Sequence, residues 1–269
     1  MTRRVKPAEL AASLEQALRE HGPPERAVHE QAYLKSSLTF LGTSVPDTRS
    51  VVRSFVREHR ELSADEIRRL AVELWEVPIF ERRAAAVMLL IADASRSRPQ
   101  DIDLVERPLR ESRTWALVDS LACDVAGDLV VRFPELGTTL DRWAADEDFW
   151  VRRAALLSLL VPLRRGGGDW PHFVRLAEPM LGEREFFIRK ALGWVLRETG
   201  KRRPELVEEW LRPRAARVSR LTLREAIKPL PAEFGAQMLT LAGARPPRAG
   251  ATSGKSDAWV TPIERPDRL

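Results

Sequence analysis

The segment FWVRRAALLSLL, at Phe149–Leu160, has two close counterparts, FERRAAAVMLL at Phe80–Leu90 and FFIRKALGWVLR at Phe186–Arg197. Their apolar residues are three and four positions apart, as they are through most of the chain, which is typical of amphipathic helices. No run alternates as a strand does, and no Asn-Gly or Asp-Gly hairpin turn is found. The pattern predicts helices at 7–20, 24–37, 47–60, 63–75, 79–97, 101–110, 114–132, 135–145, 148–163, 170–181, 185–200, 204–211, 219–228 and 231–242.

The three segments also repeat at a regular distance. Aligned on Arg83, Arg153 and Lys190, they are 70 and 37 residues apart, and a further copy aligned on Val118 divides the longer interval into two of 35. Helix pairs that recur with a period of about 35–40 residues are typical of HEAT-like or armadillo-like solenoids. The sequence therefore predicts an all-α protein, a curved solenoid of HEAT-like helical repeats (an α-α superhelix).

The inserted copy, RTWALVDSLACDVAGDLV, differs from the others at one position. Where the other copies have Ala84, Ala154 and Ala191, it has Asp119. We find no packing reason to replace a methyl group by a carboxylate there. Trp115 precedes Asp119 by four residues, so the two side chains share a helix face. This pair is the first candidate for chemistry.

The chain is basic, with a net charge of +5 and a pI of about 9.8. An excess of positive charge indicates a polyanionic partner such as nucleic acid. The alternative is that the arginines are spread over solvated helix faces. Because equivalent helices of a solenoid line one surface, we expect a basic stripe along it, made of Arg82, Arg152, Arg153, Arg189, Lys190 and Arg197.

Other classes of site have little support. The four histidines are scattered without metal-binding spacing, and there is no GxSxG elbow or Rossmann glycine motif. The single Cys123 excludes an internal disulfide and is expected to be a buried structural thiol. No signal peptide or membrane-spanning run is found, which favours a cytoplasmic protein. We expect no metal and no cofactor, one repeat domain at 1–242 and a flexible Pro/Arg/Gly-rich tail at 243–269.

The remaining candidates are aromatic and acidic. One and two repeats beyond Trp115 and Asp119 are Trp150, Arg153 and Trp194. Tryptophan faces attract cations, and a carboxylate, ionised at neutral pH, stabilises positive charge that forms beside it. A groove lined by basic residues, tryptophan faces and one carboxylate suits cleavage of an N-glycosidic bond in DNA, in which the sugar becomes cationic. The alternative is that each tryptophan packs between helices and that the aspartate is solvated or caps a helix.

The chain resembles the AlkD family of bacterial DNA alkylation repair glycosylases, which are built from HEAT-like repeats. The resemblance covers roughly residues 25–235. The segments that carry it are Tyr33-Leu-Lys35 with Phe40-Leu-Gly42 and Pro46, Trp115-x-x-x-Asp119-Ser120, Phe149-Trp-Val-Arg-Arg-Ala-Ala155, Glu185–Glu198 and Arg224-Glu-Ala-Ile-Lys228.

This resemblance implies excision of positively charged N3- and N7-alkylated purines from duplex DNA, without drawing the damaged nucleotide into a pocket. Asp119 is then the expected catalytic carboxylate, which stabilises the oxocarbenium ion and orients the attacking water. Trp115 and Trp194 are expected to pack on the deoxyribose, and Arg153 to contact the phosphates. The other residues expected to bind DNA are Tyr33, Lys35, Lys190, Arg197 and Lys228.

The chain departs from the family at Thr114 and Ala116, where relatives are more aromatic and acidic. The Trp115 and Asp119 pair that non-catalytic branches lack is nevertheless present. We therefore expect a monomeric DNA glycosylase that acts on double-stranded DNA in the cytoplasm, associated with the nucleoid when it is bound. Two alternatives are a non-catalytic repeat protein that binds damaged or branched DNA and a protein-interaction solenoid. If Asp119 is buried in the interior or faces the convex exterior, the enzymatic interpretation fails and only a passive role remains.

Overall fold

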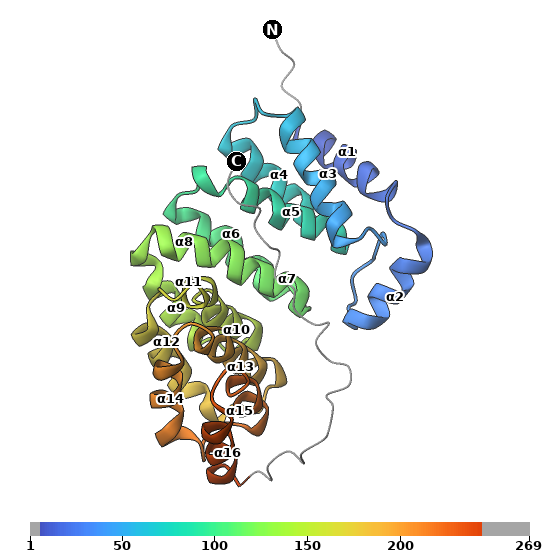
Figure 1. Ribbon diagram of the computed structural model, residues 1–269. Helices are drawn as coiled ribbons and strands as arrows, with labels where there is room; N and C mark the ends of the chain where they lie inside the picture. The colour runs from blue at the N-terminus through green and yellow to red at the C-terminus, as the bar shows by residue number, and fades with distance from the viewer. Residues whose placement is uncertain (1–5, 244–269) are drawn as a thin grey trace. The chain divides into compact units, whose positions relative to one another are not determined.

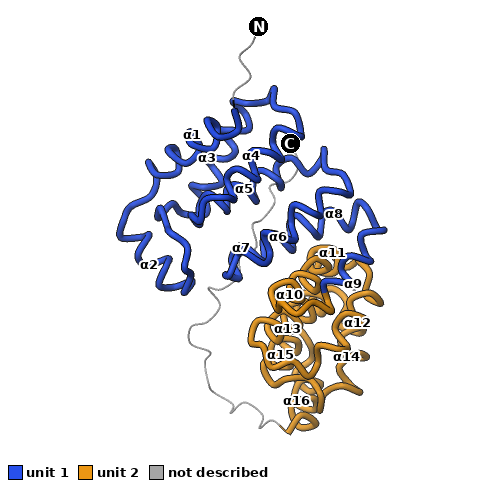
Figure 2. Tube along the Cα trace, turned by 180° about the vertical axis from the view of Figure 1, so that it is seen from behind, with its two compact units in different colours: residues 1–143 blue, residues 144–269 orange. Residues whose placement is uncertain are grey.

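Helices make up most of residues 6–243, the part of the chain that the computed structural model describes (Figure 1). That part contains no strand, only one isolated parallel bridge between Thr39 and Ile79. The all-α prediction is confirmed. The chain divides into two compact units, residues 1–143 and 144–269, which are described separately here (Figure 2).

Two helices of unit 1 begin at a serine whose side chain caps the helix. Ser44 accepts a hydrogen bond from the Asp47 amide, and Ser63 forms a reciprocal capping box with Glu66. The α-helices are α1 (Pro7–Arg19), α2 (Pro24–Leu34), α3 (Val45–Glu58), α4 (Ala64–Glu76), α5 (Phe80–Ala92), α6 (Asp103–Ser112), α7 (Trp115–Ser120), α8 (Gly127–Arg132) and α9 (Gly137–Ala144).

Unit 2 is also built from helices, most of them short except the one at Phe186–Gly200. The segment predicted as one helix at 148–163 is broken, because Pro162 has no amide hydrogen and its ring conflicts with the carbonyl four residues before it. The α-helices are α10 (Phe149–Leu157), α11 (Leu160–Arg164), α12 (Trp170–Ala177), α13 (Phe186–Gly200), α14 (Pro204–Leu211), α15 (Arg220–Ala226) and α16 (Ala232–Leu241).

Hydrogen bonds between side chains join positions one repeat apart within each unit. In unit 1 the indole nitrogens of Trp75 and Trp143 donate to Glu111 and Glu106, 36 and 37 residues away. In unit 2 Arg164 donates to Glu198, 34 residues further on. These separations are within one residue of the period of 35–37 residues that the sequence register predicts.

The connection between α2 and α3 is fixed to the start of α5. Glu81, only 2% exposed, accepts hydrogen bonds from the amides of Leu41 and Gly42 at 2.9 and 2.8 Å. Gly42 has a φ of 88°, and a Cβ atom there would lie 2.4 Å from the Pro23 carbonyl oxygen. Only glycine fits at this point. The connection that follows Tyr33 is therefore held in place by a buried carboxylate.

Glu106 joins α6 to α9. Its carboxylate accepts hydrogen bonds from Arg142, Trp143 and Arg110, and the Arg142 guanidinium is the main reason that its pKa falls to about 2. Because its pKa is lowered, Glu106 stabilises the fold at pH values above its ordinary pKa near 4.5. This contribution is lost as the pH falls toward 2.

We expect Glu106→Gln to flatten the loss of stability in acid. Between pH 4.5 and 2 the wild type should lose about 1 kcal/mol more than the variant, a value kept small because water screens a partly exposed group. Urea denaturation at several pH values measures the difference, with the exposed Glu9→Gln in α1 as a control. Parallel curves for the wild type and Glu106→Gln would contradict the assignment.

Several boundaries differ from the sequence prediction. The helix expected at 24–37 ends at Leu34, and the one expected at 79–97 ends at Ala92 and is followed by a short 3₁₀ turn. The helix expected at 114–132 contains a π-helical segment at Leu121–Ala126. Apart from residue 243, the predicted tail 243–269 lies outside the described residues. Within 6–243, no helix has the length and apolar character needed to cross a bilayer.

Candidate functional site

The candidate pair lies at the start of α7. Arg113, with a φ of 46°, ends α6, and the extended Thr114 leads into the new helix at Trp115. Trp115 and Asp119 are thus one helical turn apart on α7, as predicted. The π-helical segment Leu121–Ala126 follows directly and includes the buried Cys123. Wide turns of this kind are frequent beside functional sites.

Asp119 is buried, which is the outcome that the sequence analysis associates with a passive role. It is 9% exposed, and Trp115 beside it is partly exposed. Of the alanines at the equivalent repeat position, Ala84 in unit 1 is also partly exposed, whereas Ala154 and Ala191 in unit 2 are fully buried. The Asp119 carboxylate therefore lies at a position where two of the other repeats bury an alanine, and a small part of its own surface remains exposed.

An aromatic row leads to this pair from α2. The Tyr33 ring meets the Trp115 ring edge to face, with centroids 6.4 Å apart and planes at 74°. On the other side of Tyr33, the His29 ring is stacked at 6.4 Å with the planes 10° apart. Burial, with the nearby Glu30 charge, raises the pKa of Tyr33. The sequence prediction included Tyr33 but not His29, although their spacing of four on one helix favours contact.

Thr114 is the residue at which the sequence departs from the family pattern. It is 2% exposed, and its hydroxyl oxygen has no hydrogen-bond partner within residues 6–243. Burial of an unpaired hydroxyl is unfavourable. Nothing in the described structure explains a threonine there.

In unit 2, Arg153 of α10 has a clear structural role. It is 4% exposed, its Nη1 donates to the Phe187 carbonyl oxygen at 2.5 Å, and its guanidinium lies 5.8 Å from the Phe187 ring centroid. Trp194 of α13 is 6% exposed, with the Arg164 guanidinium 5.9 Å from its ring centroid. Both predicted site residues therefore have most of their surface covered.

The other predicted cations of unit 2 surround one acid, Glu225 of α15. Lys190, Arg197 and Lys228 lie 3.4, 2.5 and 3.2 Å from its carboxylate oxygens. Burial opposes ionisation of Glu225, but these cations outweigh it and keep its pKa below the ordinary value. Gly193 allows the close approach, because a Cβ atom there would lie 2.7 Å from Cβ of Glu225. The fold therefore brings the three cations together, and each of them already forms an ion pair with Glu225.

The predicted basic stripe needs correction at three positions, the buried Arg153 described above and two further arginines. Arg82 is 6% exposed, donates to the carbonyls of Glu73 and Leu74 and pairs with Glu15 at 2.6 Å. Arg152 donates to the Asp146 carbonyl at 2.7 Å and pairs with Glu183 at 2.9 Å. These arginines connect helices within the fold, because the repeat places their side chains beside carbonyl groups at neighbouring helix ends.

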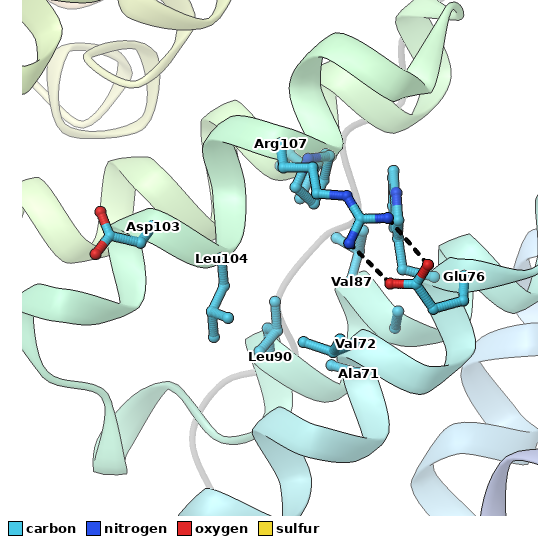
Figure 3. A pocket seen from close by; sticks show the side chains of 12 residues that line it. Ala71, Val72, Glu76, Val87, Leu90, Asp103, Leu104 and Arg107 are labelled. Carbon is cyan, nitrogen blue, oxygen red and sulfur yellow. Dashed lines mark hydrogen bonds and ion pairs between the residues drawn. The ribbon is translucent and has the colours of Figure 1, made fainter. Parts of the chain in front are cut away.

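A hollow of about 140 Å³ lies between α4, α5 and α6 (Figure 3). Its walls are mostly apolar, with Val72, Leu90 and Leu104 among them, and Arg107 pairs with Glu76 at one side at 2.8 and 3.0 Å. None of the site residues predicted from the sequence lines it. In residues 6–243, no group of three or more His, Cys, Asp or Glu side chains is arranged to hold a metal ion.

Comparison with known proteins places this chain in a family. The sequence profile of the DNA alkylation repair enzyme family matches residues 14–230. No curated protein matches the sequence.

Solved structures with the same fold include a predicted DNA alkylation repair enzyme from Enterococcus faecalis, with a TM-score of 0.70 and 24% identity over 78% of this chain and 97% of that one. AlkD2 from Streptococcus mutans matches with a TM-score of 0.56 and 14% identity over 88% of this chain and 98% of that one. The likeness in fold agrees with the profile. The chain belongs to the DNA alkylation repair enzyme family, which confirms the resemblance to AlkD seen in its sequence.

Proposed function

We propose that this protein is a DNA glycosylase that hydrolyses the N-glycosidic bond of cationic N3- and N7-alkylated purines, such as 3-methyladenine and 7-methylguanine, in duplex DNA. It acts as a cytoplasmic monomer without a cofactor and without flipping the base into a pocket. The observation that supports this most is the pair of Trp115 and Asp119 on one face of α7, where an acid replaces the alanine of the other repeats.

The chemistry needs one anion and one water molecule. The bond between C1′ and the purine nitrogen breaks, and its electron pair leaves with the base, which becomes neutral. Positive charge develops on the sugar, where the Asp119 carboxylate stabilises it. The water oxygen then bonds to C1′, and its proton passes to solvent by way of the carboxylate. The alkylated base needs no general acid, because it is already positively charged.

The aromatic residues have a supporting role in this proposal. Trp115 and Tyr33, whose rings meet in unit 1, offer an apolar edge to the deoxyribose. In unit 2, Trp194 is proposed to contact the sugar and Arg153 the phosphates, through the few per cent of their surface that stays exposed. Lys35, Lys190, Arg197 and Lys228 are proposed to bind the DNA backbone.

A second function, DNA binding without catalysis, is favoured by one observation, the low exposure of Asp119. The deciding experiment is release of free base from a methylated duplex, measured by chromatography. Release of 7-methylguanine or 3-methyladenine above the spontaneous rate supports the glycosylase. Tight binding without release supports the alternative, and no binding contradicts both.

We expect Arg153→Ala to weaken DNA binding and the excision rate together. It should also destabilise the protein by about 1–3 kcal/mol, because the Phe187 carbonyl loses a charged donor. The salt dependence of binding, measured at a temperature where the variant is folded, separates the two effects. An unchanged slope of log Kd against log salt would contradict a phosphate contact and leave Arg153 a purely structural residue.

A further inference from the structure

Two residues other than glycine have a left-handed backbone in residues 6–243, and both are basic. They are Lys35, with a φ of 48°, and Arg113, with a φ of 46°. Each is the first residue beyond a helix, Lys35 after α2 and Arg113 after α6. At this position glycine is preferred, because any side chain makes the left-handed backbone less favourable. The sequence instead has a long cation at both places.

Both cations are next to the candidate site. Lys35 is two residues from Tyr33, and Arg113 is two residues from Trp115, the two rings that meet at 6.4 Å. Figures 1 and 2 show the end of α2 and the start of α7 near each other from both sides. Two strained backbone positions therefore flank one aromatic contact, and strain of this kind often accompanies a functional site.

Neither cation is used to hold the fold together. Lys35 and Arg113 are both exposed, and neither forms a hydrogen bond or an ion pair with another described residue. Arg82 and Arg83 of the same unit are different, since both are buried and donate to backbone carbonyls. An exposed guanidinium without an acidic partner is available to an external anion.

We propose that Arg113 is a phosphate-binding residue that, together with Lys35, holds the DNA backbone against the edge formed by Tyr33 and Trp115. This inference rests on the proposed function and adds a positioning residue to it. Arg113 suits the task because its planar guanidinium binds a phosphate through two parallel hydrogen bonds. It lies two residues before Trp115, so a phosphate bound there fixes the position of the DNA relative to α7.

If Arg113 served only to end α6, its replacement by glycine would not weaken DNA binding. Arg113→Gly therefore separates the two roles, because it relieves the backbone and removes the charge at once. The proposal predicts changes of opposite sign, with Tm raised by about 2–4 °C and DNA affinity lowered about three- to tenfold at low salt. Arg113→Lys keeps the charge but not the two parallel hydrogen bonds, so it should keep the salt dependence of the wild type and lose only part of the affinity.

The experiment is a fluorescence anisotropy titration of the full chain with a labelled, unmodified duplex at several salt concentrations. We expect the slope of log Kd against log salt to fall by about one for Arg113→Gly. The control is Arg69→Ala in α4, since Arg69 is exposed and has no partner among the described residues. It removes the same charge away from the site and should leave the slope unchanged.

Three results would overturn the proposal: a wild-type slope for Arg113→Gly, an equal loss for Arg69→Ala, or no DNA binding by the wild type. Failure of the glycosylase proposal is seen separately. If Arg113→Gly lowers the slope while the wild type releases no base, the phosphate contact stands and the enzymatic function does not.

Discussion

Asp119→Asn is expected to lower the rate of 7-methylguanine release by a factor on the order of 10²–10³, with little change in DNA affinity. The substitution keeps the size of the side chain and removes its charge. Without the anion, the cationic sugar loses the group that stabilises it in the transition state. The ground-state complex depends on cations and aromatic rings, and these stay in place. The effect should therefore be on the single-turnover rate and not on Kd.

The measurement is single-turnover release of 7-methylguanine from a methylated duplex, with Kd from anisotropy on the same duplex. Asp103→Asn is a matched control, because Asp103 is an exposed acid at the start of α6 in the same unit. It changes the net charge equally and should react at the wild-type rate. A wild-type rate for Asp119→Asn would make the assigned mechanism wrong, and a lost rate with a much lower Tm would show only unfolding.

The repeat could be predicted from the sequence because its signals are local and recur. Apolar spacing sets each helix, and the register of Arg83, Arg153 and Lys190 gives a period that hydrogen bonds such as Trp75 to Glu111 reproduce. Trp115 and Asp119 were placed on one helix by the same reasoning. These predictions depend on neighbours along the chain, and that is why they are confirmed.

The roles of the cations could not be predicted in this way. The sequence shows Arg82 and Arg113 alike as basic residues near helix ends. Only the fold shows that Arg82 donates to carbonyls of α4, whereas Arg113 makes no such bond. The left-handed backbone at Lys35 and Arg113 was missed for a related reason, because neither residue is the glycine or asparagine that marks such a helix end.

The acid most critical for stability in unit 1 is expected to be Glu81, which was not singled out from the sequence. We expect Glu81→Gln to destabilise the protein by about 1–3 kcal/mol. The two carboxylate oxygens each accept one amide hydrogen, from Leu41 and Gly42. Glutamine replaces one oxygen by an NH₂ group, so that two donors face each other in a buried place. The α2–α3 connection that carries Lys35 would then be loosened.

The pH dependence gives this prediction a second test. Burial raises the pKa of Glu81, although backbone donors oppose the effect, so the folded protein binds this proton more tightly than the unfolded chain does. The contribution of Glu81 to stability is therefore complete at pH values below its ordinary pKa near 4.5. It is lost as the pH rises through the raised pKa of the folded protein. The difference in unfolding free energy between the wild type and Glu81→Gln should shrink from pH 4.5 to pH 7.5.

Urea denaturation at these two pH values measures the difference, and hydrogen exchange at the amides of Leu41 and Gly42 locates it. Glu58→Gln is the control, because Glu58 is exposed at the end of α3 and has no partner among the described residues. Equal stability of Glu81→Gln and Glu58→Gln would mean that the carboxylate does not hold the connection, and a difference that grows as the pH rises would contradict the raised pKa of Glu81. Faster exchange at both amides in Glu81→Gln alone would show that the position of Lys35 and Tyr33 depends on a buried acid that the sequence pattern does not reveal.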